Sequence, residues 1–167
     1  MEPIALSPDN TDDLEFRIEK FDYYSYWIRD ESIPVNGILR IAVIPFKILK
    51  LKTPANEKPQ FFMQSANIIS FINKGKPGIP NDKQISPEDL ESLEKREVTD
   101  MLDVHSEPYN IYTIINSKPH YRIRAKSTVT KVEIVMGLDD YFGNPTFVVD
   151  VGTSISYSYL AVDALER

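Results

Sequence analysis

The sequence predicts an α+β fold, with a mainly antiparallel sheet and a two-helix insert between N-terminal and C-terminal groups of strands. Apolar and polar residues alternate in the N-terminal third, helical periodicity follows, and alternation returns from residue 109 onward. The 167 residues match the size of one ordinary domain, and no internal repeat is evident. We therefore expect a single domain, 1–167, made of a polar lead (1–13), strands (14–52), a helical insert (60–103) and strands (109–162).

The N-terminal strands are predicted from residue 14 onward. Leu14, Phe16 and Ile18 alternate with charged residues, as in a strand with one buried face. The aromatic run YYSYWI favours a second strand, and the charges and Pro34 after it, with Asn36-Gly37, predict a turn. Pro45 interrupts the next apolar run, and its missing backbone donor indicates an edge, a bulge or a break.

The two helices are predicted for residues 61–75 and 86–103. In the first segment the apolar and small residues fall on one arc at 100° per residue: Phe61, Phe62, Ser65, Ala66, Ile68, Ile69 and Ile72. The second begins with Ser86 as N-cap, Pro87 in the first turn and two acids after it. Its acidic outer face is typical of a solvated surface helix, with partner docking as the alternative.

Two C-terminal strands carry the candidate partner-binding residues. In HYRIRAKS, the cations Arg122, Arg124 and Lys126 project to one side, which predicts the solvated face of a half-buried strand. Contact with an anionic ligand, a nucleic acid or a complementary protein is the alternative. Nucleic acid is disfavoured because the net charge is −6 and because Tyr121 lies on the face opposite the cations.

The other candidate strand is SISYSYL, which places Tyr157 and Tyr159 on one face. No charge stands between Asp150 and Asp163 to discourage edge pairing. The strand is therefore either central in the sheet, with a tyrosine in the core, or an edge covered by another chain. We expect the central position.

The residues that chemistry would require are few. The chain has no cysteine and two histidines, and it lacks a nucleophile elbow, a histidine pair with metal spacing and a glycine-rich phosphate loop. We therefore expect a non-enzymatic protein with no catalytic residues and no cofactor. An acid/base pair of His105 with Asp103 or Glu107 is the weaker alternative.

The loop GLDDYFGN offers oxygen ligands typical of a hard cation. Its candidates are Asp139, Asp140 and Asn144, but their spacing departs from the EF-hand pattern. We interpret it as a loop connecting strands. The N-terminus has no signal-peptide pattern and no run has the length of a membrane span, so no span is expected in this chain.

Three stretches resemble the K-type minor pseudopilins of type II secretion systems. They are YWIRDESIPVN (26–36), the segment 65–93, and HYRIRAKSTVTKVEIVM (120–136) with the closing SYLAVDALER. The turn departs from the family in carrying Ile33-Pro34 where Gly-Lys is typical. The resemblance implies a subunit at the tip of the periplasmic pseudopilus. Some members bind calcium, but no ligand residues carry over to this chain.

These observations together predict a non-enzymatic protein–protein interaction or assembly domain, with a pilin-like periplasmic component as the sharper version. The alternative is a small β-rich module that binds a ligand or nucleic acid. The expected partners are other protein subunits, in a homo- or hetero-oligomer. The location is extracytoplasmic if the pilin-like interpretation holds and cytoplasmic otherwise.

Overall fold

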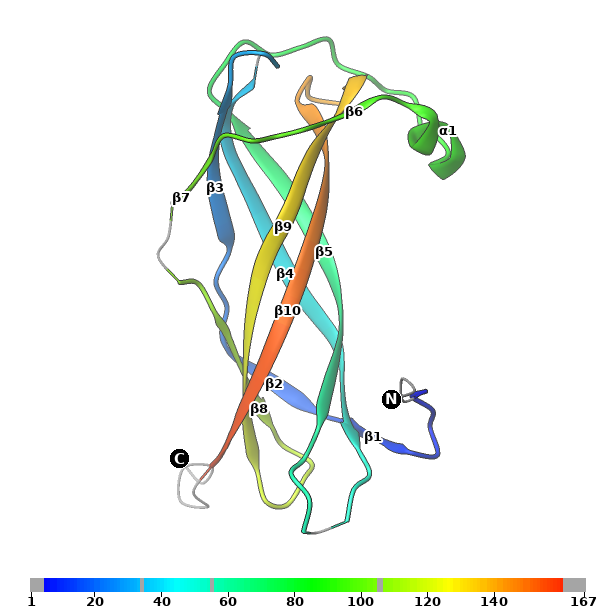
Figure 1. Cartoon of the computed structure of the whole chain (residues 1–167), viewed down its shortest axis with the longest axis vertical. Coiled ribbons are helices and arrows are strands. Elements are labelled where there is room, and N and C mark those ends of the chain that lie inside the picture. Colours follow the sequence, from blue (N-terminus) through cyan, green and yellow to red (C-terminus); the bar gives the residue numbers. More distant parts are fainter. Residues whose placement is uncertain (1–4, 34, 55, 105–106, 161–167) are drawn as a thin grey trace.

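The chain folds into an elongated sandwich of two antiparallel sheets (Figure 1). The computed structural model describes residues 5–33, 35–54, 56–104 and 107–160. Almost all regular structure there is strand, and the one helix, α1 (Pro87–Ser92), has 6 residues. The antiparallel sheet is confirmed, whereas the predicted α+β class with a two-helix insert is wrong.

Sheet A is built around the 17-residue strand β4 (Val35–Leu51). One edge of β4 pairs along its length with β5 (Phe61–Asn73). The opposite edge pairs first with β3 (Tyr24–Asp30) and then with β1 (Thr11–Leu14). The short strand β7 (Met101–Asp103) pairs with the outer side of β3.

Sheet B is built in the same way around the 19-residue strand β9 (Tyr121–Asp139). One edge of β9 pairs with β10 (Pro145–Tyr159). The other edge pairs with β8 (Asn110–Ile114) and with β6 (Lys95–Glu97). The strand β2 (Phe16–Lys20) pairs with the outer side of β8.

The two sheets are structural duplicates, a relation that the sequence did not reveal. The order β1 to β5 repeats as β6 to β10, and β4 matches β9 at an offset of 84 residues, since Thr11 pairs with Leu51 and Lys95 with Val135. Both central strands bulge at the same point: the ladder skips Phe46 in β4 and Thr130 in β9. The halves also exchange one strand each: β2 of the first half pairs in sheet B, and β7 of the second half pairs in sheet A.

Apolar residues from the facing sides of the two sheets form the core. One cluster centres on Ile28, Leu39 and Ile41, together with Val132 from sheet B. A second cluster, nearer the chain termini, contains Ile48 with sheet B residues such as Tyr112. All of these side chains are essentially fully buried, which is the main source of stability in a sandwich.

The first predicted helix is the strand β5. Its odd-numbered residues, such as Ile69 and Phe71, pack on the core, and its even-numbered residues face outward. Because Phe62, Ile68 and Ile72 on the outward face are also apolar, the strand alternation is hidden and a helical arc appears by chance.

The second predicted helix begins as expected but ends early. Ser86 caps it by accepting a hydrogen bond from the Asp89 backbone at 3.1 Å, and Pro87 opens the first turn. The chain becomes extended at Leu93, and the next residues form β6 along the edge of β9. Val98 then donates a backbone hydrogen bond to Val132 and enters the core, so sheet pairing replaces the rest of the helix.

Two details of β4 correct and confirm the sequence prediction. Asn36 and Gly37 lie inside β4 and not in a turn, which instead precedes Val35. Pro45 marks a bulge, one of the three alternatives, and it lies between the stretches of β4 that pair with β3 and with β1. Its missing backbone donor therefore leaves no ladder bond unmade on that side.

The pseudopilin-like description is also wrong for this architecture. The resemblance implies a helix, a glycine turn and a second helix in the segment 65–93, but this segment contains most of β5, an extended stretch and the short α1. No helix in the described part of the chain is long and apolar enough to span a bilayer.

Candidate interaction surface

The outer face of sheet A carries an unbroken apolar row across four strands. Leu102 of β7 lies opposite Trp27 of β3, Trp27 opposite Ile38 of β4, and Ile38 opposite Ile72 of β5. The neighbouring inward residues Ile28 and Leu39 are fully buried, so this row faces solvent. Leu102 is 65% exposed and Ile72 is 41% exposed.

The apolar character continues toward the middle of the same face. Ile68 of β5, 56% exposed, lies opposite Ala42, and Ala66 lies opposite Ile44. Between these rows stands one cation, Arg40, whose guanidinium lies 4.2 Å from the centre of the Tyr23 ring. Two apolar stretches therefore lie on this face, the row from Leu102 to Ile72 and a second stretch on β4 and β5. A polar row of Ser25, Arg40 and Ser70 separates them, and its one charge contacts an aromatic ring.

The equivalent row on sheet B is polar, and this comparison shows whether the fold itself needs apolar residues there. Arg17 of β2, Thr113 of β8, Arg122 of β9 and Ser158 of β10 lie opposite one another in that order. By the duplication they occupy the positions of Leu102, Trp27, Ile38 and Ile72. The fold is thus compatible with polar residues in this row, so folding alone does not account for the apolar side chains of sheet A.

The predicted cations lie on the outer face of sheet B, as the alternation indicated, and two of them have partners there. Arg122 forms an ion pair with Glu19 at 3.1 Å, and Glu19 also accepts a hydrogen bond from Thr113. Arg124 lies 4.0 Å from the centre of the Tyr109 ring, and Lys20 lies 3.3 Å from the same centre. Tyr109 was not singled out from the sequence, because it lies outside the alternating run.

This geometry leaves little for a base to stack on. A single-stranded nucleic-acid platform presents aromatic faces to the bases and cations to the phosphates. Lys20 and Arg124 both contact the Tyr109 ring, and the Glu19 carboxylate neutralises Arg122. The face is therefore best described as a solvated surface with its own internal pairs.

The predicted central position of the SISYSYL strand is wrong. β10 forms an edge of sheet B and pairs with β9 alone among the described strands. Tyr157 is half-buried and its ring centre lies 5.4 Å from that of Phe61, whereas Tyr159 is 58% exposed. The tyrosines thus line the open side of the sandwich, and the alternative of an edge covered by another chain remains a hypothesis.

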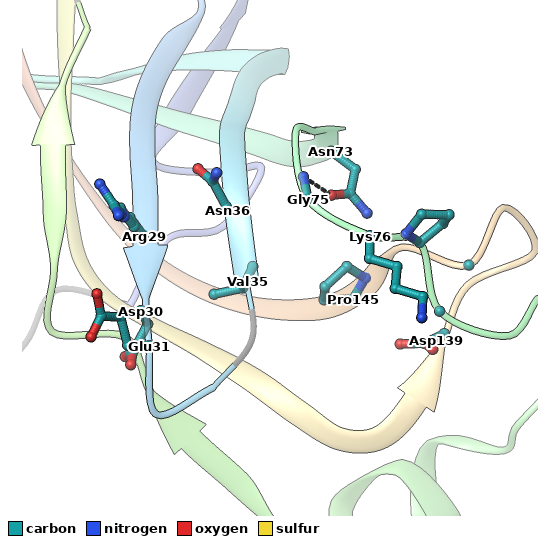
Figure 2. Close-up of a pocket in the computed structure, with 13 residues that line it drawn as sticks. Arg29, Asp30, Glu31, Val35, Asn36, Asn73, Gly75, Lys76, Asp139 and Pro145 are labelled. Atoms are coloured by element: carbon teal, nitrogen blue, oxygen red, sulfur yellow. Dashed lines mark hydrogen bonds between the residues drawn. The ribbon is translucent and has the colours of Figure 1, made fainter.

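A pocket of about 490 Å³ opens at one end of the sandwich, between the start of β4 and the loop after β5 (Figure 2). Charges of both signs line it, among them Lys76 and Asp139, which Figure 2 shows on its right-hand side. Asn36 also lines it, and the Oδ1 atom of Asn36 is buried without a hydrogen-bond partner among the described residues. A hydrogen bond from the Ser32 hydroxyl is the main cause that lowers the pKa of Asp30, another lining residue.

The candidate cation ligands form a turn. The Asp140 carboxylate accepts backbone hydrogen bonds from Phe142 and Asn144, both at 2.8 Å, which fixes the hairpin between β9 and β10. Asp139 lies against Gly78 of the neighbouring loop. Within the described ranges, no three acidic, histidine or cysteine side chains form a metal-binding group. His105, the candidate acid/base residue, lies outside the described residues.

Comparison of the chain with family models, with curated proteins and with solved structures returned no match. The class that the geometry defines is therefore a duplicated, strand-exchanged β-sandwich with one apolar and one polar outer face.

Proposed function

We propose that this protein is a non-enzymatic assembly domain that docks through the outer face of sheet A onto an apolar surface of another protein subunit. One observation carries the proposal. The row from Leu102 to Ile72 is apolar, while the equivalent row in the duplicated sheet is polar. A large apolar patch that folding does not need is the usual mark of a binding surface.

The size of the face fits this role. Strands about 4.8 Å apart and a rise of about 3.4 Å per residue give roughly 300 Å² from Ile38 to Ile44, because four strands lie side by side at Ile38 and two at Ile44. Apolar patches of about this size on monomeric proteins are often functional. Trp27 near the middle of the row is the residue type most enriched in the energetic centres of interfaces.

The charge distribution indicates protein as the occupant. Nucleic acid needs several free cations, whereas the row is flanked by Arg40, which is stacked on Tyr23, and by Arg29. An anionic lipid surface is repelled by a chain of net charge −6. A protein surface that is apolar apart from an acceptor for Arg40 can cover the face without leaving that cation unpaired.

Site-specific photo-crosslinking in the native host tests the proposal. A photoreactive residue replaces Leu102 on sheet A or, as the matched control, Ser156 on the outer face of sheet B. We expect one discrete protein adduct from position 102, lost when Ile72→Lys is added, and none from position 156. Equal adducts at both positions, adducts to lipid, or no adduct at position 102 would contradict the proposal.

The pocket supports a second candidate function, binding of a small zwitterion. Asn36, Lys76 and Asp139 line the pocket, and the opposite charges of Lys76 and Asp139 suit a molecule that carries both signs. Calorimetric titration with a panel of free amino acids tests it. Binding that Asn36→Leu abolishes would support this function, and no heat from any amino acid would exclude it.

A further inference from the structure

The edge strand β5 lacks every common device that prevents pairing with another chain. Its 13 residues contain no charge, no proline and no glycine. In the part of the chain that the structure describes, β5 pairs with β4 alone. Edge strands of soluble proteins usually carry such a guard. The equivalent strand β10 does carry Asp150, together with Pro145 and Gly152.

The hydrogen-bond pattern shows which backbone groups of β5 are free. At one end Lys74 donates to the carbonyl of Asn36, and at the other Leu51 donates to that of Gln60. In an antiparallel ladder hydrogen-bonded pairs alternate, so the even-numbered residues of β5 bond to β4. Both backbone groups of every odd-numbered residue, from Phe61 to Asn73, therefore point away from β4.

Symmetry restricts how two such edges can pair. A twofold axis perpendicular to the joined sheet keeps every side chain on its own face, so one residue must lie opposite its own copy. That residue can be odd- or even-numbered, because in either case the odd-numbered residues, which have the free backbone groups, lie opposite one another. Centring the axis on Asn67 is the one choice that pairs all 13 residues.

We propose that β5 pairs antiparallel with β5 of a second copy of this chain, with Asn67 opposite Asn67, so that the two A sheets become one continuous sheet. This rests on the proposed function, because it identifies one partner in the assembly. The closed twofold gives a dimer and not a fibre.

The side chains fit this register. On the outer face Ile72 would lie opposite Phe62 of the second copy and Ile68 opposite its Ala66, so the apolar face would continue across both copies. Like charges do not meet along the strand, since β5 has none.

The whole open side of the sandwich can enter the contact. β10 lies beside β5 there, and two aromatic pairs seal the gap: Phe71 with Phe147 at 5.0 Å and Phe61 with Tyr157 at 5.4 Å. The strand rise makes this open side about 40 Å long, and the spacing of the two stacked sheets makes it roughly 15 Å deep. Its area is therefore about 600 Å² per copy. The total of about 1,200 Å² reaches the range of stable interfaces.

The absence of cysteine from the sequence allows a direct test on the purified chain. Hydrogen-bonded partners in an antiparallel pair have Cα atoms about 5.5 Å apart, which a disulfide can bridge. Asn67→Cys should therefore form a covalent dimer rapidly on mild oxidation. In the control, Ser70→Cys, the two thiols would be six residues out of register, about 20 Å apart, and should not react.

Light scattering supplies the second readout. The wild type should have twice the mass of the 19.2 kDa chain, and Asn67→Lys should be a folded monomer, because it places a charge on the edge. A wild type that stays monomeric up to about 100 μM, or cysteine variants that crosslink equally well or not at all, would overturn the pairing. The crosslink from position 102 to another protein would be unaffected by that failure, so the two proposals fail separately.

Discussion

Gly37→Ala tests the pairing of β4 with β5, which replaces the predicted helix and the predicted turn. A Cβ atom at this position would overlap the Ile72 carbonyl oxygen and lie 2.5 Å from Cζ of Phe71. Ordinary contact begins at 3.4 Å, so the ring must move by 3.4 − 2.5 = 0.9 Å. Because Phe71 is half-buried between the core and Phe147, this movement disturbs both.

The expected cost is about 2 kcal/mol of unfolding free energy. Overpacking costs about 1–3 kcal/mol, and loss of the aromatic pair adds about 0.5–1.5 kcal/mol. Replacing glycine by alanine lowers the conformational entropy of the unfolded chain, which offsets about 0.5–1 kcal/mol of this destabilisation. Gly152→Ala is the matched control, since a Cβ there meets nothing within 4 Å. It should be neutral or slightly stabilising.

Urea unfolding followed by Trp27 fluorescence measures both variants, because Trp27 is the single tryptophan and pairs with Ile38 beside Gly37. Adding Phe71→Leu should recover about 1 kcal/mol, since it removes the clashing ring atoms. A turn glycine would also be damaged by alanine but would not couple to position 71. Strict additivity of the two substitutions would therefore refute the pairing of β4 with β5.

Two further predictions concern the core and sheet B. Burial raises the pKa of Tyr112 to about 12, with the Asn110 side chain opposing the rise, against about 10 in the unfolded chain. Because the phenol ionises more readily in the unfolded chain, its contribution to the unfolding free energy is complete below pH 10 and falls as the pH rises toward 12. About 1.4 kcal/mol of unfolding free energy is lost by pH 11. Tyr112→Phe should abolish that loss in urea titrations at pH 9 and 11, whereas exposed Tyr141→Phe should retain it; an unchanged slope in the first variant would contradict the assignment. No binding of a single-stranded oligonucleotide is expected at ~0.15 M salt. Binding removed by changing Arg122, Arg124 and Lys126 to Glu would contradict the solvated role of sheet B.

The sequence predicted features that depend on neighbouring residues. The cap at Ser86 and the alternation of Arg122 with buried Ile123 are confirmed, and of the three alternatives at Pro45 the structure has the bulge. Each follows from local chemistry: a side-chain acceptor at a helix start, a missing backbone donor, and a period of two.

The predictions that were wrong concern features that depend on distant parts of the chain. β5 was predicted as a helix because the outer face of sheet A is apolar, so its residues carry no alternation. The second helix ends at Leu93 because the edge of β9 offers hydrogen bonds to residues 95–97. The duplication left little trace, since equivalent positions hold residues as different as Trp27 and Thr113. The candidate surface was invisible for the same reason, as only the register brings Leu102 beside Trp27.

The native size of the assembled protein tests the central claim, that the outer face of sheet A is the contact surface, most directly. The chain is expressed at its natural level in the native host as wild type, as Leu102→Lys with Ile72→Lys, or as Ser156→Lys with Ser158→Lys, and extracts are separated by size. The first pair changes exposed residues and should leave the fold intact to within about 0.5 kcal/mol. We expect the wild type and the sheet B variant to elute together in a complex and the sheet A variant to elute as smaller species. Release of both variants, release of neither, or a wild type that elutes at the size of a single chain would contradict the claim.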